Sequence, residues 1–272
     1  MRVHVLQLAY DDDEPVAARV ERAAALVSGQ RDADLVVLPE LWAPTGMNYD
    51  LWTAHAESVD GPTVAAVAEA AKAIGAYVHA GSIVETAGPD APPEARGPQG
   101  RGLWNTSVLI GPEGDTLATY RKVHRFGFAS GEPQLMEAGE QLVTADLDLP
   151  DGRVRIGLAT CYDIRFPEQF RRLLDAGAEV FVVPAAWPAR RVAHWTLLGR
   201  ARAVENQCTV VQCNTAGTHA GVAMGGHSQV VDGTGVVLAE AGDGEEVLVV
   251  DVDLDVTRRW RADFPVLADR RL

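Results

Sequence analysis

Short apolar runs alternate along the chain with longer segments in which apolar residues recur at helical spacing. Runs rich in valine, leucine and isoleucine that end at glycine, proline or charged residues predict β-strands. Alanine-rich segments with apolar residues every three or four positions predict helices. The expected strands cover residues 3–9, 34–38, 77–84, 104–110, 116–120, 154–159, 180–183, 208–213, 228–232, 236–240 and 247–252. The expected helices cover 15–28, 63–74, 170–176 with a start near Pro167, and 192–206.

This alternation is typical of an α/β protein with a mixed sheet. So many strands would strain a single open sheet, which favours two packed sheets with helices outside. Residues 86–102, rich in proline, glycine and charge, are expected to form a loop, and 111–115 a hairpin turn. No repeat and no change of composition marks a linker, so residues 1–272 are expected to form one domain.

Composition narrows the possible partners. The chain carries 38 acidic and 24 basic residues, for a formal net charge of −14, which argues against a nucleic-acid or anionic-membrane partner. The first apolar run breaks at the acidic segment 11–14, unlike a signal peptide, and no run approaches the roughly 18 apolar residues of a membrane-spanning helix. We therefore expect a cytoplasmic protein.

Three cysteines fit a reducing compartment better than a disulfide framework. Cys208 and Cys213 lie five positions apart in one apolar run, so they should face opposite sides of a strand. Both are expected to be buried apolar fillers.

The third cysteine stands in a different setting. Cys161 lies between the strand expected over 154–159 and the helix that starts near Pro167. The free N–H groups of a helix N-terminus favour negative charge, so this position is expected to lower the pKa of the thiol. Glu40 and Lys122 also follow predicted strands directly. Because the carboxyl ends of strands gather the binding crevice of an α/β sheet, the three residues could meet there.

Such a set suits hydrolysis of an amide. Glu40 could take the thiol proton and later activate water. Lys122 and the backbone N–H of Tyr162 could stabilise the oxyanion that forms on the carbonyl. Taken singly, each of these residues has an ordinary explanation: a surface glutamate, a solvated lysine and an inert cysteine.

Other chemistries fit the sequence less well. A Cys–His pair would use His124 or His194, although His124 fits better as a support of the lysine loop. The histidines lack the spacing of zinc ligands, and the glycines near 225 and 235 are not followed by a phosphate-loop lysine. No metal and no cofactor is expected.

The motifs together resemble the carbon–nitrogen hydrolase (nitrilase) superfamily over essentially the whole chain. The resemblance rests on Leu-Pro-Glu at 38–40, Tyr-Arg-Lys-Val-His at 120–124 and Cys-Tyr-Asp-Ile-Arg-Phe-Pro-Glu at 161–168, supported by 201–206 and 226–228. It implies a Glu40–Lys122–Cys161 triad on a four-layer αββα sandwich. It also implies a second glutamate that orients the lysine and the substrate amide, for which Glu132 stands in the right place and Glu137 and Glu140 compete.

The substrate is less defined. The resemblance is to the amidase branch, which acts on small carboxylate-bearing amides and includes ω-amidase and deaminated-glutathione amidase types. A nitrilase, an N-carbamoyl-amino-acid hydrolase and a catalytically silent interaction module are the alternatives. Arg165 could hold a substrate carboxylate or anchor the turn after Cys161, and Trp187 could wall the pocket or pack under a helix. Arg190, Arg191 and Asn214 are weaker candidates for the substrate pocket.

The resemblance finally implies a homodimer or a higher homo-oligomer. Family members pair across a helix next to the strand of the nucleophile. The tail, residues 264–272, could cross to a partner subunit or be a frayed end.

Overall fold

The computed structural model describes residues 1–128 and 130–271 and contains two six-stranded sheets. The first sheet has the order β15-β1-β3-β4-β5-β6 and the second the order β14-β13-β10-β9-β8-β7. The first consists of β1 (Arg2–Gln7), β3 (Leu35–Val37), β4 (Tyr77–Thr86), β5 (Leu103–Ile110), β6 (Thr116–Arg121) and β15 (Glu246–Asp251). The second consists of β7 (Val143–Leu149), β8 (Gly152–Leu158), β9 (Val180–Pro184), β10 (Thr209–Cys213), β13 (Gln229–Val231) and β14 (Val237–Glu240).

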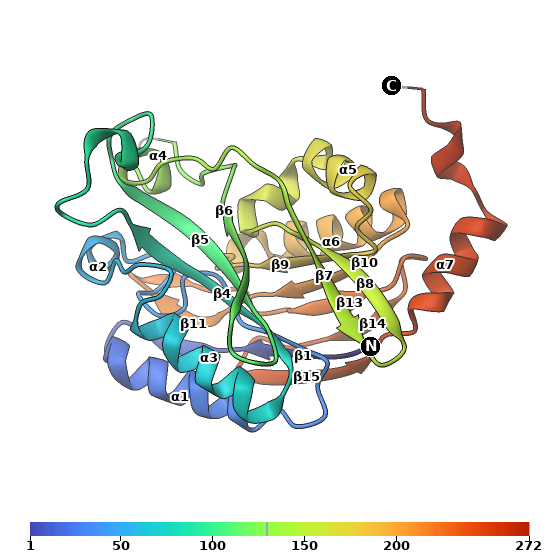
Figure 1. Ribbon diagram of the computed structural model, residues 1–272, viewed down its shortest axis with the longest axis horizontal. Helices are drawn as coiled ribbons and strands as arrows, with labels where there is room; N and C mark the ends of the chain where they lie inside the picture. Colours follow the sequence, from blue (N-terminus) through green and yellow to red (C-terminus); the bar gives the residue numbers. More distant parts are fainter. Residues whose placement is uncertain (129, 272) are drawn as a thin grey trace.

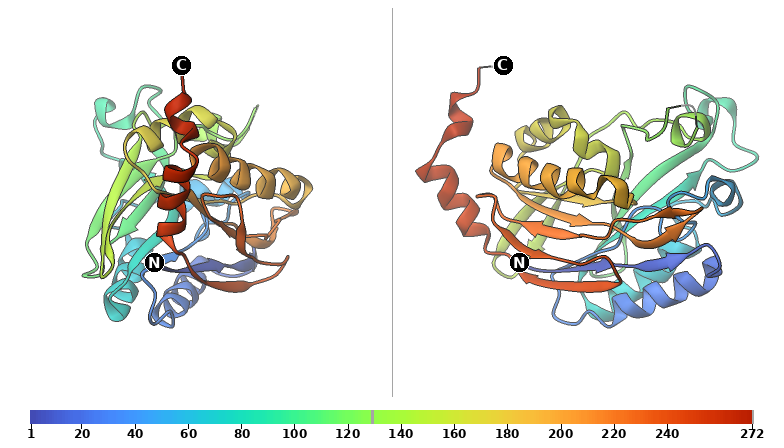
Figure 2. Two further views of the ribbon diagram at one scale, coloured as in Figure 1. Left: turned by 90° about the vertical axis from the view of Figure 1, so that its right-hand side faces the viewer. Right: turned by 180° about the vertical axis from the view of Figure 1, so that it is seen from behind.

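Helices cover the outer face of each sheet (Figures 1 and 2). On the first sheet lie α1 (Val16–Ser28) and α3 (Pro62–Ile74), which pack against each other. On the second lie α5 (Pro167–Asp175) and α6 (Val192–Asn206). The predicted four-layer αββα arrangement is therefore confirmed. The assignment of residues 1–272 to one domain stays a prediction.

Alternation along the strands explains the layers. In β3, Leu35 and Val37 point into the core between the sheets, whereas Val36 faces α1 and α3. Ile156 of β8, in the opposite sheet, belongs to the same buried cluster as Leu35 and Val37. Burying one such side chain contributes about 1.5–3 kcal/mol, so both faces of each sheet stabilise the fold.

Some elements differ from those expected from the sequence. The run 3–9 divides into β1 and β2 (Ala9–Asp11), and β2 joins a small third sheet with β11 (Ala216–His219) and β12 (Val222–Ala223). Strand β7 was not predicted, although its polar residues alternate with apolar ones as expected of a half-exposed strand at a sheet edge. The helices α2 (Tyr49–Ala54), α4 (Glu132–Leu135) and α7 (Leu254–Asp263) were not predicted either, the first two being too short to show a helical period.

The chain ends beside the sandwich. Helix α7 runs along one side of the layers, and the last described residues project beyond it (Figure 1). A short helix spans Val266–Asp269, and Arg270 then forms an ion pair with Asp175 of α5 at 2.6 Å. Leu272 lies outside the described residues. Within the described chain, no helix is long and apolar enough to cross a membrane.

Candidate active site

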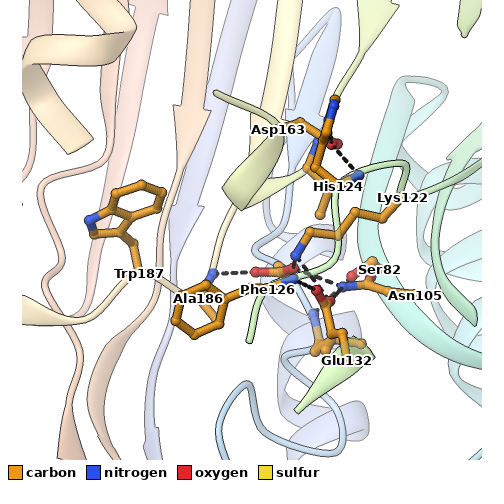
Figure 3. Close-up of polar contacts among 12 residues, drawn as sticks. Ser82, Asn105, Lys122, His124, Phe126, Glu132, Asp163, Ala186 and Trp187 are labelled. Carbon is orange, nitrogen blue, oxygen red and sulfur yellow. Dashed lines mark hydrogen bonds and ion pairs between the residues drawn. The ribbon is translucent and has the colours of Figure 1, made fainter. Parts of the chain in front are cut away.

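Two carboxylates share one buried lysine. Lys122 Nζ lies 2.7 Å from Glu40 Oε1 and 3.0 Å from Glu132 Oε1. Asn105 Nδ2 donates to the same two oxygens, at 2.8 Å and 2.6 Å. Figure 3 shows Lys122, Asn105 and Glu132 pointing toward one another. All four side chains are buried, so their polar atoms depend on each other rather than on water.

Backbone groups fix the two carboxylates. The second oxygen of Glu40 accepts the N–H of Ala186 at 2.8 Å, and the second oxygen of Glu132 accepts the N–H of Phe126. The segment before Glu40 comes so close to β4 that a Cβ on Gly81 would lie 1.9 Å from the carbonyl oxygen of Pro39. Gly81 also has a φ of +69°, so glycine suits this position on two counts.

Cys161 sits on a sharp turn at the end of β8. Its φ is +49°, a left-handed conformation that costs free energy for a residue with a side chain. A short 3-10 helix, Cys161–Arg165, follows at once, and Thr160 and Asp163 form its capping box. The turn therefore presents the sulfur at the sheet edge while the side chains on either side of it hold the backbone.

Asp163 connects this turn to the lysine strand. Its Oδ2 accepts hydrogen bonds from Tyr120 OH at 2.7 Å and from Thr160 N–H at 2.8 Å. Its Oδ1 accepts the backbone N–H of His124 at 3.0 Å and lies 2.8 Å from His124 Nδ1. His124 thus supports the lysine loop, as predicted, and its ring also stacks on Phe166.

Burial changes the proton affinities in this cluster. Burial and then the negative charge of Glu40 raise the pKa of the Cys161 thiol well above its usual value, and Lys122 only partly opposes them. The predicted lowering of this pKa is therefore wrong, because burial and the charge of Glu40 both act in the opposite direction. Burial alone would lower the pKa of Lys122, but Glu132 and Glu40 hold it well above its usual value. Burial raises the pKa of Glu132, Lys122 opposes the rise, and Glu40 adds to it.

Two adjoining hollows open on Cys161. One is lined by Glu40, Lys122 and Glu132 and contains the carboxylate–lysine cluster. The other has apolar walls made by Met47, Phe126 and Trp187 and carries Arg165 and Arg191. A larger cavity of about 690 Å³ beside Trp104 lies away from the cysteine, and its Arg121 is already paired with Glu85. The chemistry therefore belongs to the smaller hollows.

The three predicted substrate-binding residues border this site. Tyr162 packs its ring edge-on against Phe126 and Phe166. The Arg165 guanidinium lies 4.7 Å from the centre of the Trp187 ring and 3.2 Å from His194 Nδ1. Trp187 lines the pocket and also packs on Trp195 of α6, so both alternatives for it hold.

The alternatives to Glu132 and the other two cysteines lie outside this cluster. Glu137 accepts the backbone N–H groups of Gln99 and Arg101, and Glu140 is exposed. Cys208 faces the helices and Cys213 the core between the sheets, both buried as predicted. Over residues 1–128 and 130–271, no group of three or more His, Cys, Asp or Glu side chains is arranged to hold a metal ion.

With this geometry in place, comparison with known sequences settles the family. The sequence pattern of the family described as carbon-nitrogen hydrolase matches residues 2–262. The chain belongs to the carbon–nitrogen hydrolase family. Among curated relatives of this carbon–nitrogen hydrolase, the 2-oxoglutaramate amidase of Paenarthrobacter nicotinovorans is 44% identical over 269 residues, covering 99% of this chain and 89% of that protein. The omega-amidase NIT2 of Homo sapiens is 33% identical over 263 residues, covering 93% and 89%.

Solved structures agree with this assignment. XC1258 from Xanthomonas campestris, a CN-hydrolase superfamily protein with an arsenic adduct in its active site, superposes with a TM-score of 0.86 at 28% identity, covering 100% of this chain and 97% of that one. An amidase from Nesterenkonia sp. AN1, which carries acrylamide on its active-site cysteine, superposes with a TM-score of 0.72 at 27% identity, covering 98% and 99%.

Two polar residues of the hydrolase site were not predicted from the sequence. Asn105 lies inside the apolar strand β5, and Asp163 follows Cys161 by two residues. A polar residue within an otherwise apolar strand was the available signal for Asn105, since a buried amide needs partners. Of the weaker candidates, Asn214 is buried and binds the backbone of Trp187, Arg191 lines the pocket, and Arg190 is exposed.

Proposed function

We propose that this carbon–nitrogen hydrolase converts a small carboxylate-bearing amide into the corresponding acid and ammonia through a thioester on Cys161. The observation that carries the proposal is the buried lysine held between two carboxylates beside a cysteine. The 2-oxoglutaramate amidase and omega-amidase relatives support an amide with an acidic group as the substrate class.

In the first half of the reaction, Glu40 takes the proton of the Cys161 thiol as sulfur attacks the amide carbon. A base is needed because the raised pKa keeps the resting thiol protonated. The carbonyl oxygen becomes an oxyanion, which Lys122 Nζ and the backbone N–H of Tyr162 stabilise. One such donor typically contributes about 3 kcal/mol to lowering the barrier. The protonated Glu40 then returns its proton to the leaving nitrogen, the C–N bond breaks, and ammonia departs.

In the second half, Glu40 takes a proton from water as the water oxygen attacks the thioester carbon. The C–S bond breaks, the acid is released, and the proton returns to sulfur. Glu132 acts through its neighbours: it holds Lys122 in place, and its remaining hydrogen-bonding capacity orients the substrate amide.

The direct test is ammonia release with wild type and Cys161→Ala side by side. The substrates are a small ω-amide acid, the matched nitrile and the matched N-carbamoyl compound. We expect ammonia from the amide, an acyl adduct on Cys161 by mass spectrometry, and neither with Cys161→Ala. A preference for the nitrile or the carbamoyl compound would replace the amidase assignment, and no product from any of them would favour the interaction module.

We also propose a homodimer in the cytoplasm. Leu197 and Val204, one above the other on α6, are 59% and 52% exposed, which supports a partner on that helix. Three free cysteines support a reducing compartment. Sedimentation of wild type and Leu197→Asp would test the homodimer, and a monomeric wild type would contradict it. Cell fractionation would test the cytoplasmic location.

A further inference from the structure

Two arginines line one wall of the pocket, and a third lies beside one of them in the sequence. Arg165 follows Cys161 by four residues, and Arg190 and Arg191 precede α6. Arg165 and Arg191 line the hollow that contains Cys161. Arg190 is exposed and does not belong to that lining.

Among the described residues, no carboxylate neutralises the positive charge of this wall. In the part of the chain that the structure describes, none of the three arginines forms an ion pair with a carboxylate. The chain as a whole carries a net charge of −14, so carboxylates are not scarce. Burial lowers the pKa of Arg191, and the positive charges of Arg190 and Arg165 lower it further. An anion bound here would relieve this repulsion.

Arg191 is held at its backbone, whereas its guanidinium keeps its donors. Its carbonyl oxygen accepts the Trp187 indole N–H at 2.7 Å. Its guanidinium lies 5.3 Å from the centre of the Phe126 ring. Within residues 1–128 and 130–271 no side-chain hydrogen bond of Arg191 is formed, whereas Arg165 contacts His194 Nδ1 and packs on Trp187. Arg191 is therefore the better placed of the two to give a fork of N–H groups to a ligand.

We propose that Arg191 binds the carboxylate of the substrate while its amide carbon lies at Cys161, and that Arg165 adds a second positive charge nearby. Phe126, Met47 and Trp187 offer apolar walls to the short methylene chain between the two ends. The substrate class is then the monoamides of short dicarboxylic acids. This inference rests on the proposed amidase function and assigns its specificity to a particular residue.

The test compares two substrates in four proteins. The substrates are glutaramate and the neutral primary amide of similar length, hexanamide. The proteins are wild type, Arg191→Gln, Arg191→Lys and Arg190→Gln, the last being a matched loss of charge one position outside the pocket. We expect Arg191→Gln to raise KM for glutaramate by about 10–100-fold with little change in kcat, and to leave kcat/KM for hexanamide nearly unchanged. Arg191→Lys should recover part of the loss, and Arg190→Gln should resemble wild type.

A binding measurement separates recognition from turnover. Glutarate should raise the melting temperature of Cys161→Ala but not of the double variant Cys161→Ala, Arg191→Gln. Equal losses for glutaramate and hexanamide in Arg191→Gln, or equal stabilisation of both proteins by glutarate, would overturn the role of Arg191 and leave the amidase function standing. Wild type that releases ammonia from neither amide would instead overturn the proposed function, and this inference with it.

Discussion

The Tyr120 hydroxyl donates a 2.7 Å hydrogen bond to Oδ2 of Asp163, and both side chains are fully buried. Tyr120 precedes Lys122 by two residues on a strand of the first sheet, and Asp163 follows Cys161 by two residues after a strand of the second. One hydrogen bond thus links the segments that carry the lysine and the cysteine across the two sheets.

Replacing Asp163 should disturb stability and activity together. Asp163→Asn keeps the shape but removes the charge that accepts from Tyr120, Thr160 and His124. We expect a loss of about 3 kcal/mol in the free energy of unfolding by urea titration and a fall in kcat. Tyr120→Phe removes a single donor and should cost only about 1 kcal/mol. Equal stability of Asp163→Asn and wild type would contradict the bridging role.

Two neighbouring buried glutamates should behave differently. Glu132→Gln weakens the hold on Lys122, so we expect kcat to fall on the order of 100-fold, with little change in melting temperature. Glu137→Gln weakens the anchoring of the loop at Gln99 and Arg101, so it should cost about 1–3 kcal/mol of stability and leave kcat nearly unchanged. The reverse pattern would move the role of Glu132 to Glu137.

The Glu40 charge should act on the thiol in a measurable direction. Burial and then Glu40 raise the pKa of Cys161, so Glu40→Gln should lower that pKa even as it abolishes ammonia release. Thiolate absorbance at 240 nm should therefore appear at lower pH in Glu40→Gln than in wild type, with Cys161→Ala as the blank. An unchanged or higher titration midpoint would argue against the electrostatic coupling.

The rate of alkylation by iodoacetamide gives a second test of the reactivity of Cys161. Cys161 opens on a pocket, whereas Cys208 and Cys213 are 0% exposed. We expect the iodoacetamide label on Cys161 long before it appears on the other two, read by peptide mass spectrometry. Equal, slow labelling of all three would speak against a reactive cysteine.

Two buried histidines should make the fold sensitive to acid. Burial lowers the pKa of His79 and of His219 from 6.5 to about 4. Between these values the unfolded chain binds protons that the folded chain does not, so the free energy of unfolding should fall as pH drops from 6.5 to about 4. The loss approaches about 3 kcal/mol per histidine at the lower limit.

Urea titrations at several pH values would measure this loss. His219→Gln should flatten the slope by roughly half, since one of the two groups is removed. A wild type equally stable at pH 4.5 and 6.5 would contradict the assignment.

Local patterns predicted much of the framework. The strands before Glu40, Lys122 and Cys161, the helices α1, α3 and α6, and the opposite orientations of Cys208 and Cys213 all follow from the alternation of polar and apolar positions. The split of 3–9 between two sheets and the edge strand β7 were not predicted. The split depends on pairing partners far along the chain, whereas β7 carries the alternation of a strand in its own sequence, a local signal that was missed.

The sequence by itself determined the fold class, the positions of three reactive side chains at strand ends and the family motifs. Only the tertiary structure decided that Asn105 joins the two carboxylates and that Asp163 bridges the sheets. It also decided that Arg191 faces the cysteine pocket with no carboxylate of the described residues as its counter-ion. It also reversed the expected pKa shift of Cys161. The physical reason is that the periodicity of a strand or helix depends on residues that are neighbours in the sequence. Desolvation and charge pairing instead involve residues far apart in the chain, such as Glu40 and Lys122, and arise only when the sheets pack.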